Sequence, residues 1–362
     1  MKLKIFAAVS ALAMIFALSF TACGERKETP IIEFDYKFTN IEENGETVGY
    51  KLDGFADGVS YSEAVIPDSH NGKPVTVISE KAFYCNSEIV SVRVSDSVKT
   101  VGKEAFYGCE NLKSVTLGKE TVSVGELSFA DCPALETVNF GEKLKTIESY
   151  AFSQCVGLSS AVFPSALESI GECAFVGCEN LERAVLNDGL KTISDCAFGG
   201  CKLLKEFIMP DSVASIGWGV IMFEAGSVGF VPPGDSSNNL TKIVISDNIT
   251  EIPDFAFSKS NIASARIGKK VRTIRYSSFY GCGLLENVII PVSVAKIESY
   301  AFYKCESLSS VYYEGTAEEW AKISIGKNGN DVSTADKFFY SETRPETDGN
   351  YWRYVDGVPV KW

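Results

Sequence analysis

The segment Ala105-Phe106-Tyr107-Gly108-Cys109-Glu110-Asn111-Leu112 recurs along the chain with its phenylalanine and its cysteine kept. The phenylalanine stands at Phe106, Phe129, Phe152, Phe175 and Phe198, and the cysteine at Cys109, Cys132, Cys155, Cys178 and Cys201. Each step is 23 residues. A fixed period of this length indicates a solenoid, because one unit cannot bury its own apolar face and must stack on its neighbours.

The period continues on both sides of this block. Phe83 lies one step before Phe106. After an interruption, the phenylalanine returns at Phe257, Phe279 and Phe302. Phe198 and Phe257 are 59 residues apart, which is two periods plus 13 residues. We therefore expect one degenerate repeat between them, in which Val220-Ile221 replaces Ala-Phe and an insertion holds the extra length.

Each repeat contains an alternating stretch that predicts a strand with one buried side. Leu112 and Val115 point inward, while Ser114 and Thr116 point outward. A second short extended piece follows, often Thr-Ile or Ser-Ile, and the Ala-Phe-x-x-Cys segment then returns the chain as a tight or short helical turn. The pattern predicts that each rung adds one strand to a parallel sheet on one face, with phenylalanine and leucine as the core.

The fullest form of the repeat is Ala-Phe-x-x-Cys-x-x-Leu-x-x-Val-x-Leu-Pro-x-Ser-Val-x-x-Ile, and it is most complete at Cys155 to Ile170 and Cys201 to Ile216. It resembles the leucine-rich repeat of BspA-like bacterial surface proteins, over about Ala64 to Tyr313. The tail from Gly315 to Trp362 is similar to the closing segment of such proteins. The resemblance implies a β-rich, right-handed, curved solenoid of about ten rungs with capped ends, exported for adhesion or ligand binding rather than catalysis.

The first 23 residues have the features of a targeting segment. Lys2 and Lys4 precede an apolar run from Ile5 to Leu18, which is short for a membrane-spanning helix. The small residues Thr21 and Ala22 precede Cys23 and resemble a bacterial lipobox. We therefore expect a lipidated Cys23 that anchors the protein to the outer face of a bacterial membrane, with a plain secretory signal as the alternative.

These patterns divide the chain into successive segments. They are a signal peptide (1–23), a tether (24–30), an N-terminal cap with the first rung (31–79), the solenoid (80–314, with the degenerate repeat and insertion at 218–239) and an aromatic C-terminal cap (315–362). We expect Thr316 to cap a short helix over Ala317 to Lys322. The aromatic residues of the tail would close the hydrophobic end; as an alternative they form a carbohydrate platform, which requires Trp352 and Trp362 to be exposed and coplanar.

The charge and motif content exclude several classes of function. With 34 basic and 47 acidic residues the net charge is -13, and no repeat supplies a basic stripe, so we expect no nucleic-acid partner. The only histidine, His70, lies in a predicted surface turn without a nucleophile placed to use it. The chain has no phosphate-binding loop, dinucleotide fingerprint or H-E-x-x-H motif. We therefore expect no enzyme, no catalytic residue and no cofactor.

Ten cysteines follow Cys23. Cys173 with Cys178, and Cys196 with Cys201, form two C-x4-C pairs that could suggest a four-thiolate metal site. The period instead assigns Cys178 and Cys201 to the recurring column, which leaves Cys173 and Cys196 at a more outward position. We expect buried structural thiols and no metal. Disulfides are the alternative, but adjacent rungs lie about 4.8 Å apart with parallel side chains, so bridging would strain them. A reduced ladder would suit a reducing or anaerobic habitat.

One column of outward strand positions changes character along the solenoid. It reads Arg93, Thr116, Asn139, Val162, Val185, Ile208, Val244, Arg266, Ile289 and Tyr312. The aliphatic stripe Val162, Val185, Ile208 and Val244 would be about 15 Å long and would lie beside the insertion with Trp218, Phe223 and Phe230. Arg183 and Arg266 flank it and could anchor an acidic ligand. The alternative is that exposed strand positions favour β-branched residues in any case.

These observations predict non-covalent recognition of a host or neighbouring-cell protein through the sheet face, that is, adhesion. A glycan-binding module that uses the aromatic tail and a passive envelope scaffold are the alternatives. Membrane contact would run only through the lipid anchor, and we expect no oligomer.

Overall fold

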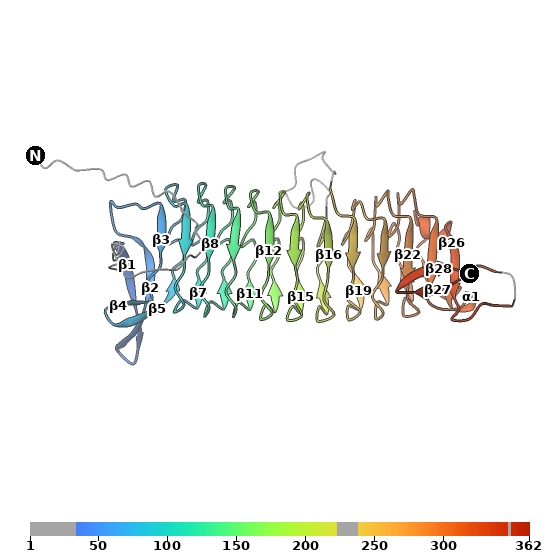
Figure 1. The fold of residues 1–362 in the computed structure, drawn as a ribbon, viewed down its shortest axis with the longest axis horizontal. Helices are drawn as coiled ribbons and strands as arrows, with labels where there is room; N and C mark the ends of the chain where they lie inside the picture. The colour runs from blue at the N-terminus through green and yellow to red at the C-terminus, as the bar shows by residue number, and fades with distance from the viewer. Residues whose placement is uncertain (1–33, 223–237, 347–348) are drawn as a thin grey trace, which may run out of the picture. The chain divides into compact units, whose positions relative to one another are not determined.

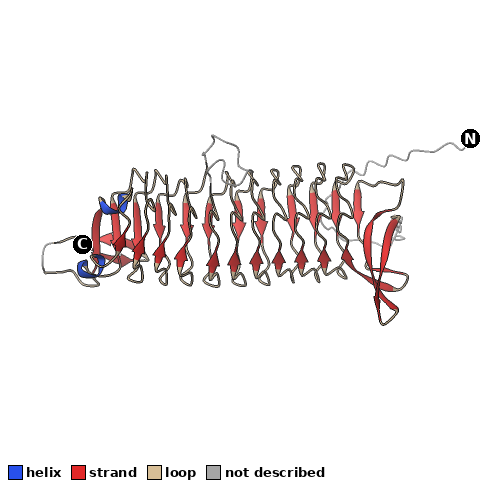
Figure 2. Cartoon of the chain, turned by 180° about the vertical axis from the view of Figure 1, so that it is seen from behind, coloured by secondary structure: helices blue, strands red, loops and turns tan. Residues whose placement is uncertain are grey.

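A computed structural model describes residues 34–222, 238–346 and 349–362. Phe34–Trp362 is one compact unit, in which the chain winds through about 12 turns stacked in a row (Figure 1). Almost all regular structure is strand, and the little helix lies near the C-terminus (Figure 2). The predicted β-rich repeat solenoid is confirmed, with slightly more rungs than expected. No helix among the described residues is long and apolar enough to cross a membrane.

The predicted strand of each rung builds the first ladder. Its strands are β3 (Glu63–Val65), β6 (Ser91–Arg93), β8 (Ser114–Thr116), β10 (Thr137–Asn139), β12 (Ser160–Val162), β14 (Arg183–Val185), β16 (Glu206–Ile208), β18 (Lys242–Val244), β20 (Ser264–Arg266), β22 (Asn287–Ile290), β24 (Ser310–Tyr313) and β26 (Asp336–Tyr340). Paired strands are parallel and in step, as in the pairing of Val92 with Val115, and the pairing is interrupted between β10 and β12 and between β14 and β16. The two extra rungs are β3 and β26, because both caps continue the ladder.

The second extended piece of each rung also forms a ladder, which the single predicted sheet did not include. Its strands are β5 (Lys73–Ile78), β7 (Thr100–Val101), β9 (Ser123–Val124), β11 (Thr146–Ile147), β13 (Ser169–Ile170), β15 (Thr192–Ile193), β17 (Ser215–Ile216), β19 (Glu251–Ile252), β21 (Thr273–Ile274), β23 (Lys296–Ile297) and β25 (Ser324–Ile325). From β7 to β23 two residues per rung suffice, because the second residue of each strand is buried in the shared core while the first faces outward.

The Ala-Phe-x-x-Cys segment forms successive tight turns. From Phe106 to Phe198 the rings stack at centroid distances of 5.1–5.3 Å and within 7° of parallel. Each cysteine of the recurring column donates its thiol to the carbonyl of the phenylalanine one rung earlier, as Cys155 does to Phe129 at 3.1 Å. The column therefore consists of buried, hydrogen-bonded thiols, and every described cysteine is free.

The residue just before each Ala-Phe pair adopts a left-handed backbone, for example Glu104 (φ 52°) and Tyr150 (φ 59°). Cys173 and Cys196 hold this position, yet both are fully buried. The predicted outward position of these two cysteines was therefore wrong. Aromatic and sulfur-containing side chains of neighbouring rungs gather over them and form a small apolar cluster outside the main core.

The degenerate repeat is where the period predicts it. The N–H of Phe198 donates to Val220 O and the N–H of Ile221 to Ala256 O, both at 3.0 Å, so Val220-Ile221 replaces Ala-Phe in the stack. The first ladder runs on across this rung, since Phe207 in β16 pairs with Ile243 in β18. The second ladder stops at β17 and starts again at β19.

The two ends of the solenoid are covered differently. At the N-terminus, β1 (Tyr36–Glu43) and β2 (Glu46–Phe55) form a hairpin around Asn44-Gly45, where both residues have positive φ as its tight turn requires. The strand β2 then pairs with β5. A small second hairpin joins β4 (Ser69–His70) to β5.

At the C-terminus, Thr316 caps α1 (Ala317–Trp320) through a capping box with Glu319, so the helix is as predicted but shorter. A 3-10 helix, Asp331–Ser333, precedes β26, and a hairpin of β27 (Tyr351–Val355) and β28 (Val358–Lys361) ends the sheet.

Candidate binding surface

The outward column of the first ladder has the predicted register. Val162 pairs with Val185, and Ile208 pairs with Val244. The side chains of Val162 and Ile208 are 53% and 39% exposed, and the two valines between and beyond them are half-buried. The middle rungs therefore present a contiguous aliphatic stripe, which is Val162, Val185, Ile208 and Val244.

The stripe has different neighbours at its two ends. Towards the N-terminus the column is polar and exposed, with Arg93, Thr116 and Asn139. Towards the C-terminus, Ile289 and Tyr312 are buried with Trp352 in a cluster covered by the terminal hairpin. The C-terminal cap thus closes the end of the solenoid and also covers the last rungs of the first-ladder face. The stripe is the part of the column that remains aliphatic and open.

The structure does not bring all the predicted site residues to the stripe. Trp218 follows β17 of the second ladder, where its ring packs against the small cluster of Cys173 and Cys196. The expectation that Trp218 borders the stripe was therefore wrong, because that residue leaves the second ladder rather than the first. Phe223, Phe230 and Cys23 lie outside the described residues.

The two predicted arginine anchors differ. Arg183 is exposed on β14, two residues before Val185, and has no ion-pair partner in the described part of the chain. Arg266 is half-buried and pairs with Asp247 at 3.1 Å. Burial alone would raise the pKa of Asp247, but the N–H of Lys269 and the Arg266 guanidinium lower it. Arg266 is therefore already neutralised, which leaves Arg183 as the free cation beside the stripe.

The carbohydrate platform predicted for the tail is not formed. Trp352 is fully buried and donates its indole N–H to Tyr313 O at 2.9 Å. Trp362 is 37% exposed, with the Arg353 guanidinium 4.1 Å from its ring centre. Because Trp352 is buried against Tyr312 over the last rungs of the first ladder, the two rings cannot present one surface. The glycan alternative in this form was wrong.

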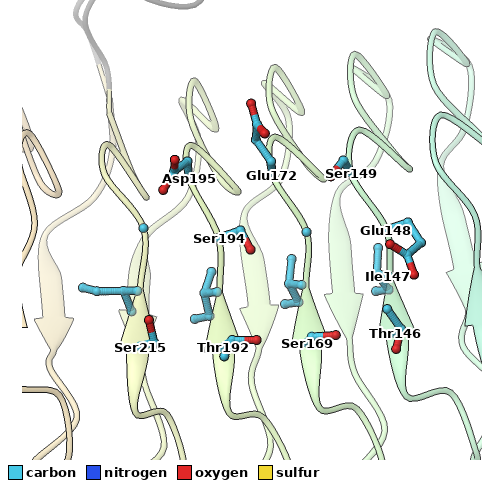
Figure 3. A pocket seen from close by; sticks show the side chains of 15 residues that line it. Thr146, Ile147, Glu148, Ser149, Ser169, Glu172, Thr192, Ser194, Asp195 and Ser215 are labelled. Carbon is cyan, nitrogen blue, oxygen red and sulfur yellow. The ribbon is translucent and has the colours of Figure 1, made fainter.

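A groove lies on the second ladder, and it was not predicted from the sequence. It has a volume of about 660 Å³ and runs along β11, β13, β15 and β17. Figure 3 shows its row of hydroxyl side chains, which are Thr146, Ser169, Thr192 and Ser215. Glu172 and Asp195 stand where the strands lead into the turns (Figure 3). The recurring Ser or Thr before each buried isoleucine was the signal for this row.

None of these surfaces has the arrangement of a catalytic centre. His70 stacks on Phe38 at 4.0 Å and touches Tyr50 edge-on at 4.8 Å, so it serves the N-terminal cap. Within 34–222, 238–346 and 349–362, no group of three or more His, Cys, Asp or Glu side chains could hold a metal ion. Burial raises the pKa of the Cys155 and Cys178 thiols, which disfavours the reactive thiolate. What the surfaces offer is shape, apolar contact and hydrogen bonding.

The repeat and the fold together define the class of protein. The chain matches the model of the BspA type leucine rich repeat region in six copies, over residues 76–205, 146–223 and 235–326. These matches span more than half of the chain, and the protein therefore belongs to the BspA type leucine-rich repeat family. A solenoid of this family is typically a non-enzymatic scaffold for protein interaction.

Several solved structures are similar to this chain. A leucine rich cell surface protein from Faecalibacterium prausnitzii is 22% identical, with a TM-score of 0.39, over 82% of this chain and 98% of that one. A leucine rich repeat protein of T. pallidum is 29% identical, with a TM-score of 0.47, over 57% and 91%. A leucine-rich repeat protein from Bacteroides ovatus is 19% identical, with a TM-score of 0.45, over 86% and 100%. No curated protein matches the chain significantly.

Proposed function

We propose that this protein is an exported, surface-displayed adhesin that binds a protein partner through the middle rungs of the first ladder. The single observation that carries the proposal is the exposed aliphatic stripe on successive parallel strands, in which Val162 is 53% and Ile208 39% exposed. Contiguous apolar surface of this kind on a monomer marks a contact site. A lipidated Cys23 would hold the solenoid at the outer face of a bacterial membrane.

The residues around the stripe support a protein partner. Two residues before each stripe position, a second outward column carries Arg183, Glu206 and Lys242. An apolar centre with a charged rim is the composition of a specific protein interface. Arg183, which has no ion-pair partner among the described residues, would add a charge-assisted contact to a carboxylate of the partner.

The test is binding of the full chain, purified in mild detergent, to immobilised host extracellular-matrix proteins and, separately, to cell-wall glycans. The decisive variant is Val162→Asp/Val185→Asp/Ile208→Asp, which places three carboxylates in the stripe. Binding to a matrix protein should weaken at least about tenfold, because each buried, unpaired carboxylate is strongly unfavourable.

A matched control adds the same charge to the other ladder. Thr146→Asp/Ser169→Asp/Thr192→Asp changes three outward positions in the groove of the second ladder. It should leave binding to the matrix protein intact, and circular dichroism should show both variants folded. An equal loss of binding in both variants would show that the added negative charge causes the loss wherever it is placed. Retention of binding in the stripe variant would contradict the proposed site, and capture by glycans alone would contradict a protein partner.

A further inference from the structure

Two cysteines lie outside the recurring thiol column, and the fold brings them together. Cys173 and Cys196 hold the same position in adjacent rungs and are fully buried. The N–H of Cys173 donates to Asp195 O and that of Cys196 to Trp218 O, both at 2.9 Å, so their backbones are held in step. With Val176 and Met222 they form a cluster separate from the main core. Their side chains therefore lie side by side in a small apolar cluster at the turn edge.

The thiols of this pair differ from those of the recurring column in what they bond to. All seven cysteines of that column donate to a phenylalanine carbonyl at 3.1–3.3 Å. In the described part of the chain, Cys173 and Cys196 have no such carbonyl acceptor. They lie instead as neighbours within the small cluster. Their sulfur atoms are thus not committed to the backbone.

A third sulfur lies in the same cluster. Gly219 takes the equivalent position in the next rung, and a Cβ there would lie 3.3 Å from Cys196 Sγ and 3.4 Å from Met222 Cβ. A glycine at this position therefore leaves Cys196 and Met222 room to approach each other. Tyr150, Trp218 and Phe255 pack around the cluster and limit the access of water.

We propose that Cys173, Cys196 and Met222 bind one soft monovalent metal ion, with Cu(I) as the natural choice. Two thiolates and a thioether form the donor set that selects Cu(I). Hard divalent ions need oxygen ligands and structural zinc needs four ligands, and this cluster provides neither. The proposal revises the expectation from sequence that the chain holds no metal, and it is independent of the proposed protein-binding function.

The spacing of the rungs favours a metal over a disulfide. Adjacent parallel strands are about 4.8 Å apart. Two metal–sulfur bonds of about 2.3 Å, the length found for metal thiolates, allow the two sulfur atoms to stay up to about 4.6 Å apart, so they remain possible when the third sulfur bends them away from a straight line. A sulfur–sulfur bond of about 2.05 Å would need the two side chains to converge. On binding, the two thiols lose their protons to solvent, and Cu⁺ with two thiolates and the neutral thioether forms a complex of charge −1.

The test is anaerobic titration of the reduced full chain with Cu(I) in the presence of a competing Cu(I) chelator. One equivalent should stay on the protein. Subsequent alkylation and mass spectrometry should show Cys173 and Cys196 protected, with Cys85, the exposed thiol, still modified. X-ray absorption should show sulfur neighbours only, at about 2.3 Å.

Variants separate the proposed site from the other thiols. Cys173→Ser/Cys196→Ser should lose the retained copper, and Met222→Leu should weaken its affinity about tenfold or more. Cys155→Ser/Cys178→Ser removes two thiols with the same spacing from the recurring column and should still bind one equivalent. If that control misfolds, the alkylation pattern of the unaltered protein decides. No retained copper, retention by Cys173→Ser/Cys196→Ser, or protection of other cysteines would each overturn the proposal.

Discussion

The rung that carries the insertion differs from the five regular rungs between Phe106 and Phe198, although its core residues occupy the same positions in the repeat. In the regular rungs, phenylalanine rings stack almost parallel and the second ladder is continuous from β5 to β17, whereas the first ladder is divided between β10 and β12 and again between β14 and β16. In the interrupted rung, Ile221 replaces the ring and the second ladder stops between β17 and β19. The first ladder crosses the same rung unbroken.

The break in the second ladder has a local cause. In a regular rung, the residue after the strand donates its N–H to the rung before, as Gly217 does to Ile193 O at 2.8 Å. After the insertion this position is Pro253, which has no N–H to donate. The first ladder has no proline within its paired residues at β16 and β18. At this rung, the second ladder is interrupted where a donor is lost, while the core change at Ile221 leaves β16 and β18 of the first ladder paired.

The largest expected effect comes from the phenylalanine stack. Phe152 lies between Phe129 and Phe175, 5.3 Å from each ring centre. Phe152→Ala should lower the free energy of unfolding by about 3–5 kcal/mol. Ile221→Ala should cost less, near the lower part of the range of about 2–5 kcal/mol, because no aromatic ring stacks on it. Urea denaturation followed by circular dichroism measures both. Equal losses would show that ring stacking adds nothing to burial.

Removal of a column thiol should have a smaller effect. Cys155→Ala leaves the carbonyl of Phe129 without its donor in the core and should cost about 1–3 kcal/mol. Ser260, at the equivalent position after the interruption, bonds to Phe257 O of its own rung at 2.8 Å. Ser260→Ala should cost about 1 kcal/mol. The exposed Cys85→Ala is the control, and a loss there as large as in Cys155→Ala would contradict the role of the thiol bond.

Restoring the missing donor should have a smaller effect still. Pro253→Ala returns an N–H to the second ladder, and the new hydrogen bond should raise the free energy of unfolding by about 1 kcal/mol. The same change gives the unfolded chain more conformational freedom, which should lower the free energy of unfolding by about 0.4–1 kcal/mol. Net stability should change little. Hydrogen exchange should instead show a protected amide at position 253 and slower exchange around β19. Rapid exchange at that amide would contradict the proline as the cause of the break.

The smallest effect concerns acid. The pKa of Asp247 lies below its usual value in the folded protein, although its burial acts in the opposite direction. Its contribution to stability is therefore complete above the pKa of an unfolded aspartate, about 3.9, and is lost as the pH falls through the lower folded value. Asp247→Asn should flatten the fall in stability below about pH 4. Glu168→Gln in the regular rungs should have a smaller effect, because Lys191 and Lys145 also lower the pKa of this carboxyl but solvent screens both surface pairs.

Much of this architecture could be predicted from periodicity, because each rung repeats one local solution. The spacing of phenylalanine and cysteine placed the buried column, and the residue count from Phe198 to Phe257 located the degenerate repeat at Val220-Ile221. The register of Val162 with Val185 followed from the same count. The second ladder was missed because a strand of two residues has no alternation that a sequence pattern can detect.

Other features depend on segments that meet only in the folded chain. Trp352 is buried because the terminal hairpin folds over the outward residues Ile289 and Tyr312, which the aromatic composition of the tail did not reveal. Arg266 is neutralised by Asp247, 19 residues away. The burial of Cys173 and Cys196 needs Met222 and Trp218, contributed by the next rung.

The sequence by itself determined the solenoid, its period, its core columns and the place of its one irregular rung, because stacking identical units makes local pattern and global fold the same problem. Only the tertiary structure decided which outward residues stay open, which charges are already paired and which sulfur atoms meet. These properties depend on contacts between rungs and with the caps, and no spacing within one repeat encodes them.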